Sequence, residues 1–266
     1  MRVLTWNLWW RHGPWEERRK AIAATLAQVA PDVCGLQEVW GTPTENLAAE
    51  LAAELGMHWC WTWLPPPDDW SYGEDVAIGN AVLSRWPIIE QTERPLPAGE
   101  GEEQRVALHA RIAAPGGALP FFTTHFTARL GGSAARTAQV CGLVEFIADY
   151  LADTAYPPVV TGDLNAEPDS DELRLLGGLL TPPVVPGLVL VDAWRYAPPG
   201  DPGFTWDRRN GYLADSIYPD SRIDYIMVGL PQEGRGQVWA AWLEGLAPVG
   251  GVWPSDHFAV VADLQD

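Results

Sequence analysis

Val159-Val160-Thr161-Gly162-Asp163-Leu164-Asn165 is a short apolar run that passes directly into a turn carrying an acid and an amide. The preceding segment, Ser133–Asp149, has apolar residues at helical spacing, which predicts a helix followed by a strand. The N-terminal part has the same organisation, with a strand at Val3–Trp6, a helix at Trp15–Val29 and a strand at Val33–Gln37. Helix and strand units in both halves predict a layered, mixed α/β fold.

The rest of the chain is mostly strand-like, so two βα-rich halves with antiparallel strands in each predict two packed sheets flanked by helices. A surface loop that could overhang a site is expected at Pro65–Asp75, and a Pro- and Gly-rich stretch runs from Thr181 to Gly211. Thr44 and Ser133 are the expected helix caps. The other expected elements are helices at Thr44–Leu55 and Asp169–Leu176, and strands at Met57–Leu64, Ala77–Ser84, Ile88–Glu93, Arg105–Ile112, Ala118–His125, Arg222–Val228, Gln237–Leu243 and Phe258–Leu264.

The composition is that of a globular protein with a large core, because 47% of the 266 residues are hydrophobic and 20% are charged. We expect residues 1–266 to form one domain and the protein to be a monomer. No run of 18 apolar residues and no export signal is recognised, so no membrane span is expected. The three cysteines are widely spaced among apolar residues, which predicts buried free thiols and a cytoplasmic protein.

The chain is strongly acidic, with 17 Lys and Arg against 35 Asp and Glu and a formal charge of −18. Such a field repels polyanions unless basic residues are gathered locally, so extended nucleic acid is disfavoured as a partner. The acidity also has a simple explanation in solubility. The basic residues that cluster are Arg11, Arg18, Arg19 and Lys20, and that group could still grip a short strand or a single phosphate.

Polar side chains follow apolar strands repeatedly: Asn7 after the first strand, Glu38 after the second, and Asp163 with Asn165 after Val159-Val160-Thr161. Loops at strand ends are where rigid scaffolds present functional groups. Any one of these residues could simply cap a turn. The repetition favours a common site at the strand ends.

Ser255-Asp256-His257 stands immediately before the last apolar strand. A single histidine at such a position is more often structural than catalytic, but Asp256 beside it and a further acid at Asp224 favour a functional histidine. A carboxylate contact raises the basicity of an imidazole and fixes its tautomer.

The donor set indicates Mg²⁺ or Mn²⁺, because these ions prefer oxygen ligands and need only one or two carboxylates from the protein. Glu38 meets that requirement. The histidines show no close ligand spacing, so zinc is the weaker alternative. No Walker loop and no Gly-x-Ser-x-Gly elbow occurs, which leaves hydrolysis by an activated water.

Six short motifs, in the same order from end to end, resemble those of the endonuclease/exonuclease/phosphatase superfamily. This superfamily includes deoxyribonuclease I-like nucleases, abasic-site endonucleases, neutral sphingomyelinases, inositol polyphosphate 5-phosphatases and deadenylases, so the resemblance implies the chemistry better than the substrate. The motifs are Thr5-Trp6-Asn7, Leu36-Gln37-Glu38-Val39, Thr124-His125-Phe126, Gly162-Asp163-Leu164-Asn165, Arg222-Ile223-Asp224-Tyr225 and Ser255-Asp256-His257.

The resemblance implies a four-layer α/β/β/α sandwich, with two central mixed sheets flanked by helices and a site at one edge. It implies that Glu38 binds the metal, with Asn7 and Asp256 as direct or water-mediated ligands. Whether one or two metal ions bind is left open.

The resemblance also implies the catalytic roles. Asp163 would orient or deprotonate the attacking water, and Asn165 would hold a phosphate oxygen. His257 would be the general base or a phosphate contact oriented by Asp224, and His125 would contact the phosphate or assist the leaving group. These roles agree with general requirements for phosphoryl transfer to water.

Two weaker matches concern substrate binding. Asn80, in Gly79-Asn80-Ala81-Val82-Leu83-Ser84-Arg85, and Arg105 resemble residues that line the site in family members, although both could be structural. Thr205-Trp206-Asp207 also resembles a family stretch, for which a packing role is favoured.

The sequence therefore predicts a divalent-metal-dependent hydrolase of phosphate esters, mono- or diesters, acting on a small or non-polymeric substrate. An apolar or sugar moiety could rest on Trp59, Trp61, Trp63 and Trp70, although core positions are the commoner place for such residues. One alternative is an endo- or exonuclease on DNA or RNA. The other is a non-catalytic binding module, which would be expected if a metal or base position had been lost; none has been.

Overall fold

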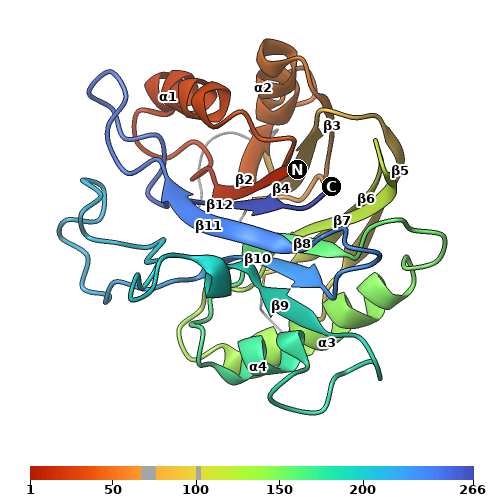
Figure 1. Cartoon of the computed structure of the whole chain (residues 1–266). Helices are drawn as coiled ribbons and strands as arrows, with labels where there is room; N and C mark the ends of the chain where they lie inside the picture. Colours follow the sequence, from red (N-terminus) through yellow and green to blue (C-terminus); the bar gives the residue numbers. More distant parts are fainter. Residues whose placement is uncertain (67–75, 100–102) are drawn as a thin grey trace.

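The computed structural model describes residues 1–66, 76–99 and 103–266. Two six-stranded sheets pack face to face, with two helices over the outer face of each sheet (Figure 1). The chain therefore has the four-layer α/β/β/α sandwich that the motifs predicted. Residues 67–75 of the expected surface loop, and Trp70 with them, lie outside the described residues.

The first sheet, sheet A, has the strand order β11-β12-β1-β2-β4-β3. Strand β1 pairs with β2 in parallel and with β12 in antiparallel orientation, so the N-terminal strand lies at the centre of the sheet. Helices α1 (Trp15–Val29) and α2 (Leu47–Leu55) cover its outer face. The strands are β1 (Arg2–Asn7), β2 (Val33–Gly41), β3 (His58–Trp61), β4 (Ala77–Ser84), β11 (Val238–Glu244) and β12 (Ala259–Leu264).

The second sheet, sheet B, has the order β5-β6-β7-β8-β10-β9 and repeats the central parallel pair as β7 and β8. Helices α3 (Ser133–Ala148) and α4 (Asp171–Gly177) cover its outer face, and the 3₁₀ helix η1 (Ala193–Tyr196) follows β9. The strands are β5 (Ile88–Pro95), β6 (Val106–Ala114), β7 (Gly117–His125), β8 (Val159–Asp163), β9 (Leu190–Asp192) and β10 (Asp224–Gly229).

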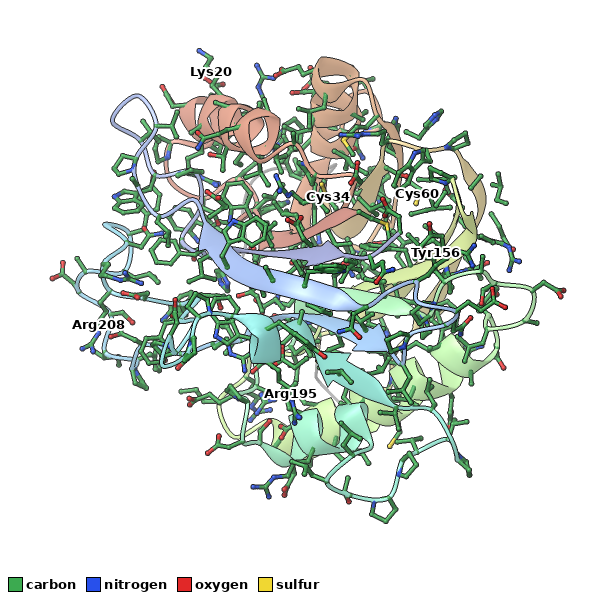
Figure 2. All side chains as sticks on the ribbon, in the orientation of Figure 1. Lys20, Cys34, Cys60, Tyr156, Arg195 and Arg208 are labelled. Atoms are coloured by element: carbon green, nitrogen blue, oxygen red, sulfur yellow. The ribbon has the colours of Figure 1, made fainter. Side chains whose placement is uncertain are left out.

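Apolar residues of the central strands point alternately to the two faces of each sheet, because successive side chains of a strand point in opposite directions. Val3 and Phe121 pack between the sheets, whereas Leu4 packs under the helices of sheet A and Phe122 under those of sheet B. Cys34 and Cys60 are buried free thiols in sheet A (Figure 2), and Cys141 is a partly buried free thiol. No helix among the described residues is long and apolar enough to cross a membrane.

Three expectations about local structure were wrong. Asn46, not Thr44, caps α2, and its side chain accepts a hydrogen bond from the Ala49 amide. Ser133 is the first residue of α3 rather than its cap, which is Gly132. Residues 181–211 contain β9 and η1, although only irregular chain was expected there. Strand β9 depends on tertiary pairing with β10, which the local sequence does not reveal.

His109, on β6, is fully buried among the rings of Phe122, Phe146 and Tyr150. Neither ring nitrogen has a hydrogen-bond partner among the described residues. Burial, with a smaller contribution from the nearby Arg111, lowers the pKa of His109 to about 4. The unfolded chain, with a pKa near its ordinary value, therefore binds this proton more tightly than the folded chain.

We expect this histidine to destabilise the protein in acid. Above about pH 6.5 the histidine is neutral in both states, and the full free energy of unfolding is present. This free energy decreases as the pH falls toward 4, and the loss is about 2 kcal/mol at pH 5. The difference in free energy of unfolding between His109→Leu and wild type, measured in urea, should therefore rise in favour of the variant by about that much between pH 7.5 and pH 5. The curve of His58→Leu, a change at an exposed position of β3, should run parallel to wild type. Parallel curves for His109→Leu as well would contradict the prediction.

Candidate active site

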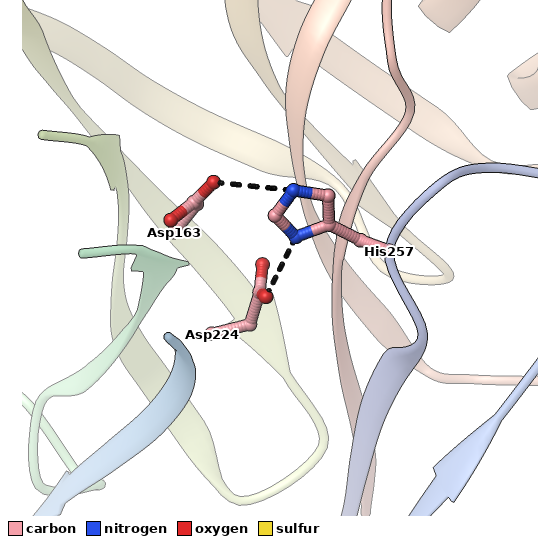
Figure 3. Close-up of side chains that lie close together, drawn as sticks. All are labelled: Asp163, Asp224 and His257. Atoms are coloured by element: carbon pink, nitrogen blue, oxygen red, sulfur yellow. Dashed lines mark hydrogen bonds and ion pairs between the residues drawn. The ribbon is translucent and has the colours of Figure 1, made fainter. Parts of the chain in front are cut away.

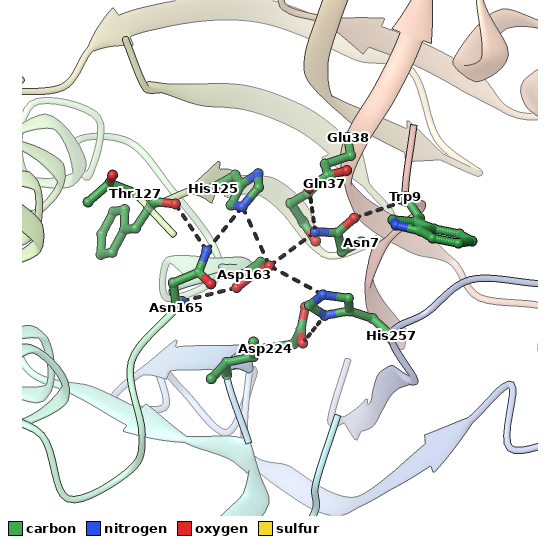
Figure 4. Close-up of polar contacts among 12 residues, drawn as sticks. Asn7, Trp9, Gln37, Glu38, His125, Thr127, Asp163, Asn165, Asp224 and His257 are labelled. Atoms are coloured by element: carbon green, nitrogen blue, oxygen red, sulfur yellow. Dashed lines mark hydrogen bonds and ion pairs between the residues drawn. The ribbon is translucent and has the colours of Figure 1, made fainter. Parts of the chain in front are cut away.

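The strand ends of the two sheets meet at one edge of the sandwich and bring the predicted catalytic and metal-binding residues together (Figure 4). The parallel pairs place Asn7 at the end of β1 and set His125 and Asp163 side by side at the ends of β7 and β8. Asp224, the first residue of β10, is the antiparallel partner of Asp163. The site thus depends on strand register in both sheets.

Glu38 stands at an irregularity of β2. The register with β4 shifts between Leu36 and Val39, and Glu38 has a left-handed backbone with φ of 51°. A bulge of this kind redirects a side chain and is common beside active sites. The Glu38 Oε1 atom accepts a hydrogen bond from Asn7 Nδ2 (3.2 Å), whereas the buried Oε2 atom has no partner among the described residues.

Asn7 joins the two sheets. Its Nδ2 atom donates to Glu38 of sheet A and to Oδ2 of Asp163 of sheet B (3.0 Å). Its Oδ1 atom accepts from the Trp9 amide (2.9 Å), so one of its two lone pairs is already used. The amide group therefore fixes the relative positions of two carboxylates that come from different sheets.

His257 lies between two carboxylates (Figure 3). Its Nδ1 atom is 2.9 Å from Oδ2 of Asp224, and its Nε2 atom is 3.8 Å from Oδ2 of Asp163. Burial alone would lower the pKa of His257, but Asp224, Asp256 and Asp163 together raise it well above its ordinary value. Because a carboxylate only accepts hydrogen bonds, Nδ1 donates to Asp224. The Nε2 atom, on the other side of the ring, faces Asp163.

Burial, reinforced by the charge of Asp224, raises the pKa of Asp163 to about 7. Burial also raises the pKa of Asp256 to about 7 and raises that of Glu38. Three buried carboxylates are therefore held close together without enough positive charge to compensate them. Such a group is stabilised by a bound cation.

His125 is buried between Arg105 and Asn165. Its Nδ1 atom lies 3.1 Å from Nη1 of Arg105, which can only donate, so Nδ1 accepts and the ring proton resides on Nε2. The Nε2–H faces Oδ2 of Asp163 (3.5 Å), whereas Nδ2 of Asn165 (3.1 Å) is itself a donor, to the Phe126 carbonyl, and cannot accept this proton. Burial, followed by the charges of Arg105 and His257, lowers the pKa of His125 well below its ordinary value. This ring is a neutral hydrogen-bond donor.

The two weaker candidates differ in position. Arg105 contacts His125 and also pairs with Glu103 at the surface, so it adjoins the site. Asn80 is buried, and its Nδ2 atom donates to the backbone carbonyl of Val106 (2.9 Å), which links β4 to β6. The side chain of Asn80 does not line the cavity of the site.

Two sets of side chains could hold a metal ion. One ligand atom each from Asp163, Asp224 and His257 lie within 4.8 Å of one another. In that set, Oδ2 of Asp224 and Nδ1 of His257 are already hydrogen-bonded to each other, although Oδ1 of Asp224 has no partner among the described residues. Glu38 offers an unpaired, buried oxygen close to two further oxygen donors, Asp256 and Asn7, which suits a hard cation better.

A cavity of about 440 Å³ opens over these residues. Its outer walls are largely apolar and aromatic, with Trp206 edge-on to the His257 ring at 5.2 Å between centroids. Trp59, Trp61 and Trp63 do not line this cavity, because they lie on or just after β3, the edge strand of sheet A. The large aromatic and aliphatic residues of this wall are Trp9, Leu130, Trp206, Tyr218 and Ile223, and the smaller Ala128 and Pro219 also line it.

Arg18 was assigned by its sequence to a surface cluster, but its guanidinium is buried and bound to backbone carbonyls. Two neighbours in that cluster are also engaged internally: Arg11 stacks on Trp40 and Arg19 pairs with Glu54. Arg18 ties the loop after Asn7 to the segment that enters Asp256. The acceptors are the carbonyls of Leu8, Trp9, Trp10, His12 and Pro254.

We expect Arg18→Met to lower the free energy of unfolding by at least about 3 kcal/mol, because it leaves several buried carbonyls without donors. Arg19→Met is the matched control, since its surface ion pair should contribute less than about 1 kcal/mol. Urea denaturation of both variants at one pH measures the difference. Equal losses in the two variants would show that the carbonyl contacts of Arg18 contribute little.

The fold and the site define a four-layer α/β sandwich with a cluster of carboxylates and histidines that could hold a metal ion. The model of the Endonuclease/Exonuclease/phosphatase family matches residues 4–257. The chain belongs to this family, whose members are hydrolases of phosphate esters and are typically divalent-metal dependent.

Three proteins that are similar to this chain carry different names. Nocturnin from Rattus norvegicus is 29% identical over 94% of this chain, and the chain spans 59% of the length of that relative. TDP2 from D. rerio, solved in complex with a single-strand DNA product, has a TM-score of 0.77 and 19% identity over 100% of this chain and 99% of its own. A mannosyl-6-phosphatase from Bacteroides thetaiotaomicron has a TM-score of 0.71 and 18% identity over 100% of both chains. The two structural likenesses show the fold alone.

Proposed function

We propose that the protein hydrolyses a small or non-polymeric phosphate ester with the help of a divalent cation, by in-line attack of an activated water on phosphorus. The observation that carries this proposal is the array Glu38–Asn7–Asp163–His257–Asp224, which crosses from one sheet to the other without interruption. Both histidines and Asp256 are buried beside one cavity, and the half-buried Glu38 also lines it. These are the parts that phosphoryl transfer to water requires.

We propose Mg²⁺, with Mn²⁺ as a substitute, held by Glu38 with Asp256 and Asn7 as direct or water-mediated ligands. The unpaired Oε2 atom of Glu38 and the raised pKa values of Glu38 and Asp256 support this ligand set. When bound, the cation would supply positive charge that polarises a phosphoryl oxygen and stabilises the transition state.

Asp163 accepts the proton of the attacking water in this mechanism. A general base works best with a pKa near the working pH, and burial raises the pKa of Asp163 to about that value. His257, kept cationic by Asp224, donates from Nε2 to a phosphoryl oxygen. The neutral Nε2–H of His125 and the amide of Asn165 provide two further donors beside it. Arg105 holds the His125 ring in that tautomer.

The surroundings of the cavity favour a substrate with little charge beyond the reacting phosphate. Two arginines beside the site are ion-paired, Arg105 with Glu103 and Arg136 with Glu172. The net charge of −18 repels a long polyanion. The apolar outer wall suits an uncharged or apolar leaving group. A nuclease remains the second candidate, because chains of this fold include one solved with a single-strand DNA product.

A substrate screen tests this proposal. Aryl phosphomonoesters and diesters, sugar phosphates, phospholipids, oligonucleotides and plasmid DNA would be assayed with Mg²⁺ and with Mn²⁺ over a salt titration. We expect the highest kcat/KM on a small ester, with little dependence on salt. A preference for nucleic acid that falls steeply with salt would favour the nuclease. No turnover of any ester would favour a binding module.

We also propose that the protein acts as a cytoplasmic monomer. Burial raises the pKa of the Cys60 thiol to about 12 and that of Cys34 further, so both thiols are unreactive, and neither requires an oxidising compartment. Sedimentation at the assay concentration measures the oligomeric state, and a dimer would contradict this proposal.

A further inference from the structure

A second cavity, of about 280 Å³, lies beneath sheet B between α4, β9, η1 and β10. Its floor is formed by Leu190, Trp194 and Met227, all of which are at least nine-tenths buried. Leu179 and Leu180 stand at its rim with exposed fractions of 50% and 73%. Large aliphatic side chains exposed at the mouth of an apolar cavity indicate a surface that a ligand can cover.

Cations gather at this cavity although the chain is strongly acidic. Arg174, Arg195 and Arg222 line it together with a single acid, Asp192. Arg222 is buried, donates from Nη1 to Oδ2 of Asp192 (2.7 Å), and stacks on the Tyr225 ring. Arg195, on η1, is exposed and has no ion-pair partner among the described residues. Because Arg174 pairs with Asp171 and Arg222 with Asp192, the uncompensated positive charge at this cavity is that of Arg195, within a protein of net charge −18.

We propose that this cavity binds a small organic anion. The carbon skeleton of the ligand packs on Leu190, Trp194 and Met227, and its carboxylate or phosphate pairs with Arg195 and Arg222. Apolar walls with a few convergent polar groups are typical of small-ligand sites, and arginine recognises such anions through paired, charge-assisted hydrogen bonds. The ligand site is distinct from the proposed active site and does not depend on its chemistry.

The two cavities share a wall. Pro168 and Arg222 line the second cavity, whereas their chain neighbours Glu167 and Ile223 line the first. The Tyr225 hydroxyl lies 2.8 Å from the carbonyl of Arg222 and 2.7 Å from that of Ala166, so it braces both segments of this wall. Arg222, with which the ligand pairs, is two residues before Asp224, the partner of His257.

Isothermal titration with octanoate tests the proposal on the full chain. We expect one saturable site, and the isosteric neutral probe octanamide should bind at least about tenfold more weakly, because the charge-assisted contacts are lost. Arg195→Gln should weaken octanoate binding by about tenfold without affecting folding, since its side chain is exposed.

Arg208→Gln is the matched control, because Arg208 is an exposed arginine on another loop, paired with Asp220 (Figure 2). It should leave octanoate affinity unchanged, and so should Glu38→Gln in the proposed active site. The proposal is overturned if octanoate does not bind, if octanamide binds equally well, or if Arg195→Gln has no larger effect than Arg208→Gln. A changed octanoate affinity in Glu38→Gln, in either direction, would likewise overturn it, by locating the anion at the first cavity.

Discussion

Glu38→Gln is expected to lower the turnover of an aryl phosphodiester by about a thousandfold or more, since a bound cation contributes several kcal/mol to transition-state stabilisation. The change is nearly isosteric and keeps an oxygen that can accept from Asn7 Nδ2. It removes the negative charge and the unpaired oxygen that would bind the cation. Because that charge is buried beside Asp163 and Asp256, its removal should not lower the stability of the metal-free protein.

The matched control is Glu90→Gln, the same chemical change at an exposed position of β5. It should keep wild-type turnover. Activity of both variants would be compared with their thermal unfolding in the presence of a chelator. Turnover by Glu38→Gln within tenfold of wild type, in a folded protein, would show that Glu38 is not essential for metal binding.

His257→Ala is expected to lower kcat by about a thousandfold, within the range that a positioned acid or base contributes. Asp224→Asn tests how His257 acts, because it keeps the imidazole and an oxygen that can accept from Nδ1 but removes the charge that raises the pKa of that ring. With that support removed, burial lowers the pKa of His257. If the cationic ring is the active form, the alkaline limb of the kcat profile moves to lower pH.

Asp220→Asn provides the comparison, because Asp220 is an acid on a surface loop paired with Arg208. Its pH profile should coincide with that of wild type. A uniform fall in the rate of Asp224→Asn at all pH values, with no displacement of the alkaline limb, would mean that Asp224 only holds the ring in place. Wild-type rates in His257→Ala would remove this histidine from the mechanism.

Polar residues at the ends of apolar strands are the signal by which the sequence alone could locate much of the site. Asn7 and Asp163 each follow a run of apolar residues, and parallel pairing of β1 with β2 and of β7 with β8 brings such ends to one edge. Glu38 was expected directly after the second strand, whereas it lies within β2, where a register shift and a left-handed backbone set its orientation. Neither feature has a local sequence signal, because both are imposed by pairing with β4.

Residues whose burial is decided by tertiary structure were harder to interpret. Arg18 stands in an acidic and basic helix start that is typical of a solvated surface, yet five carbonyls bind its guanidinium in the interior. Asn80 resembled a residue that lines the site, whereas its amide links two strands. The anion cavity depends on β9, a strand of three residues whose existence requires β10 beside it.

The central claim is that a divalent cation held by Glu38 and its neighbours is needed for hydrolysis. The most direct test is turnover of a generic aryl phosphodiester after exhaustive chelation, followed by titration with Mg²⁺ or Mn²⁺. We predict that chelation abolishes turnover and that Mg²⁺ restores it saturably in wild type but not in Glu38→Gln. Full turnover in the chelated protein, or equal recovery in Glu38→Gln, would contradict the claim.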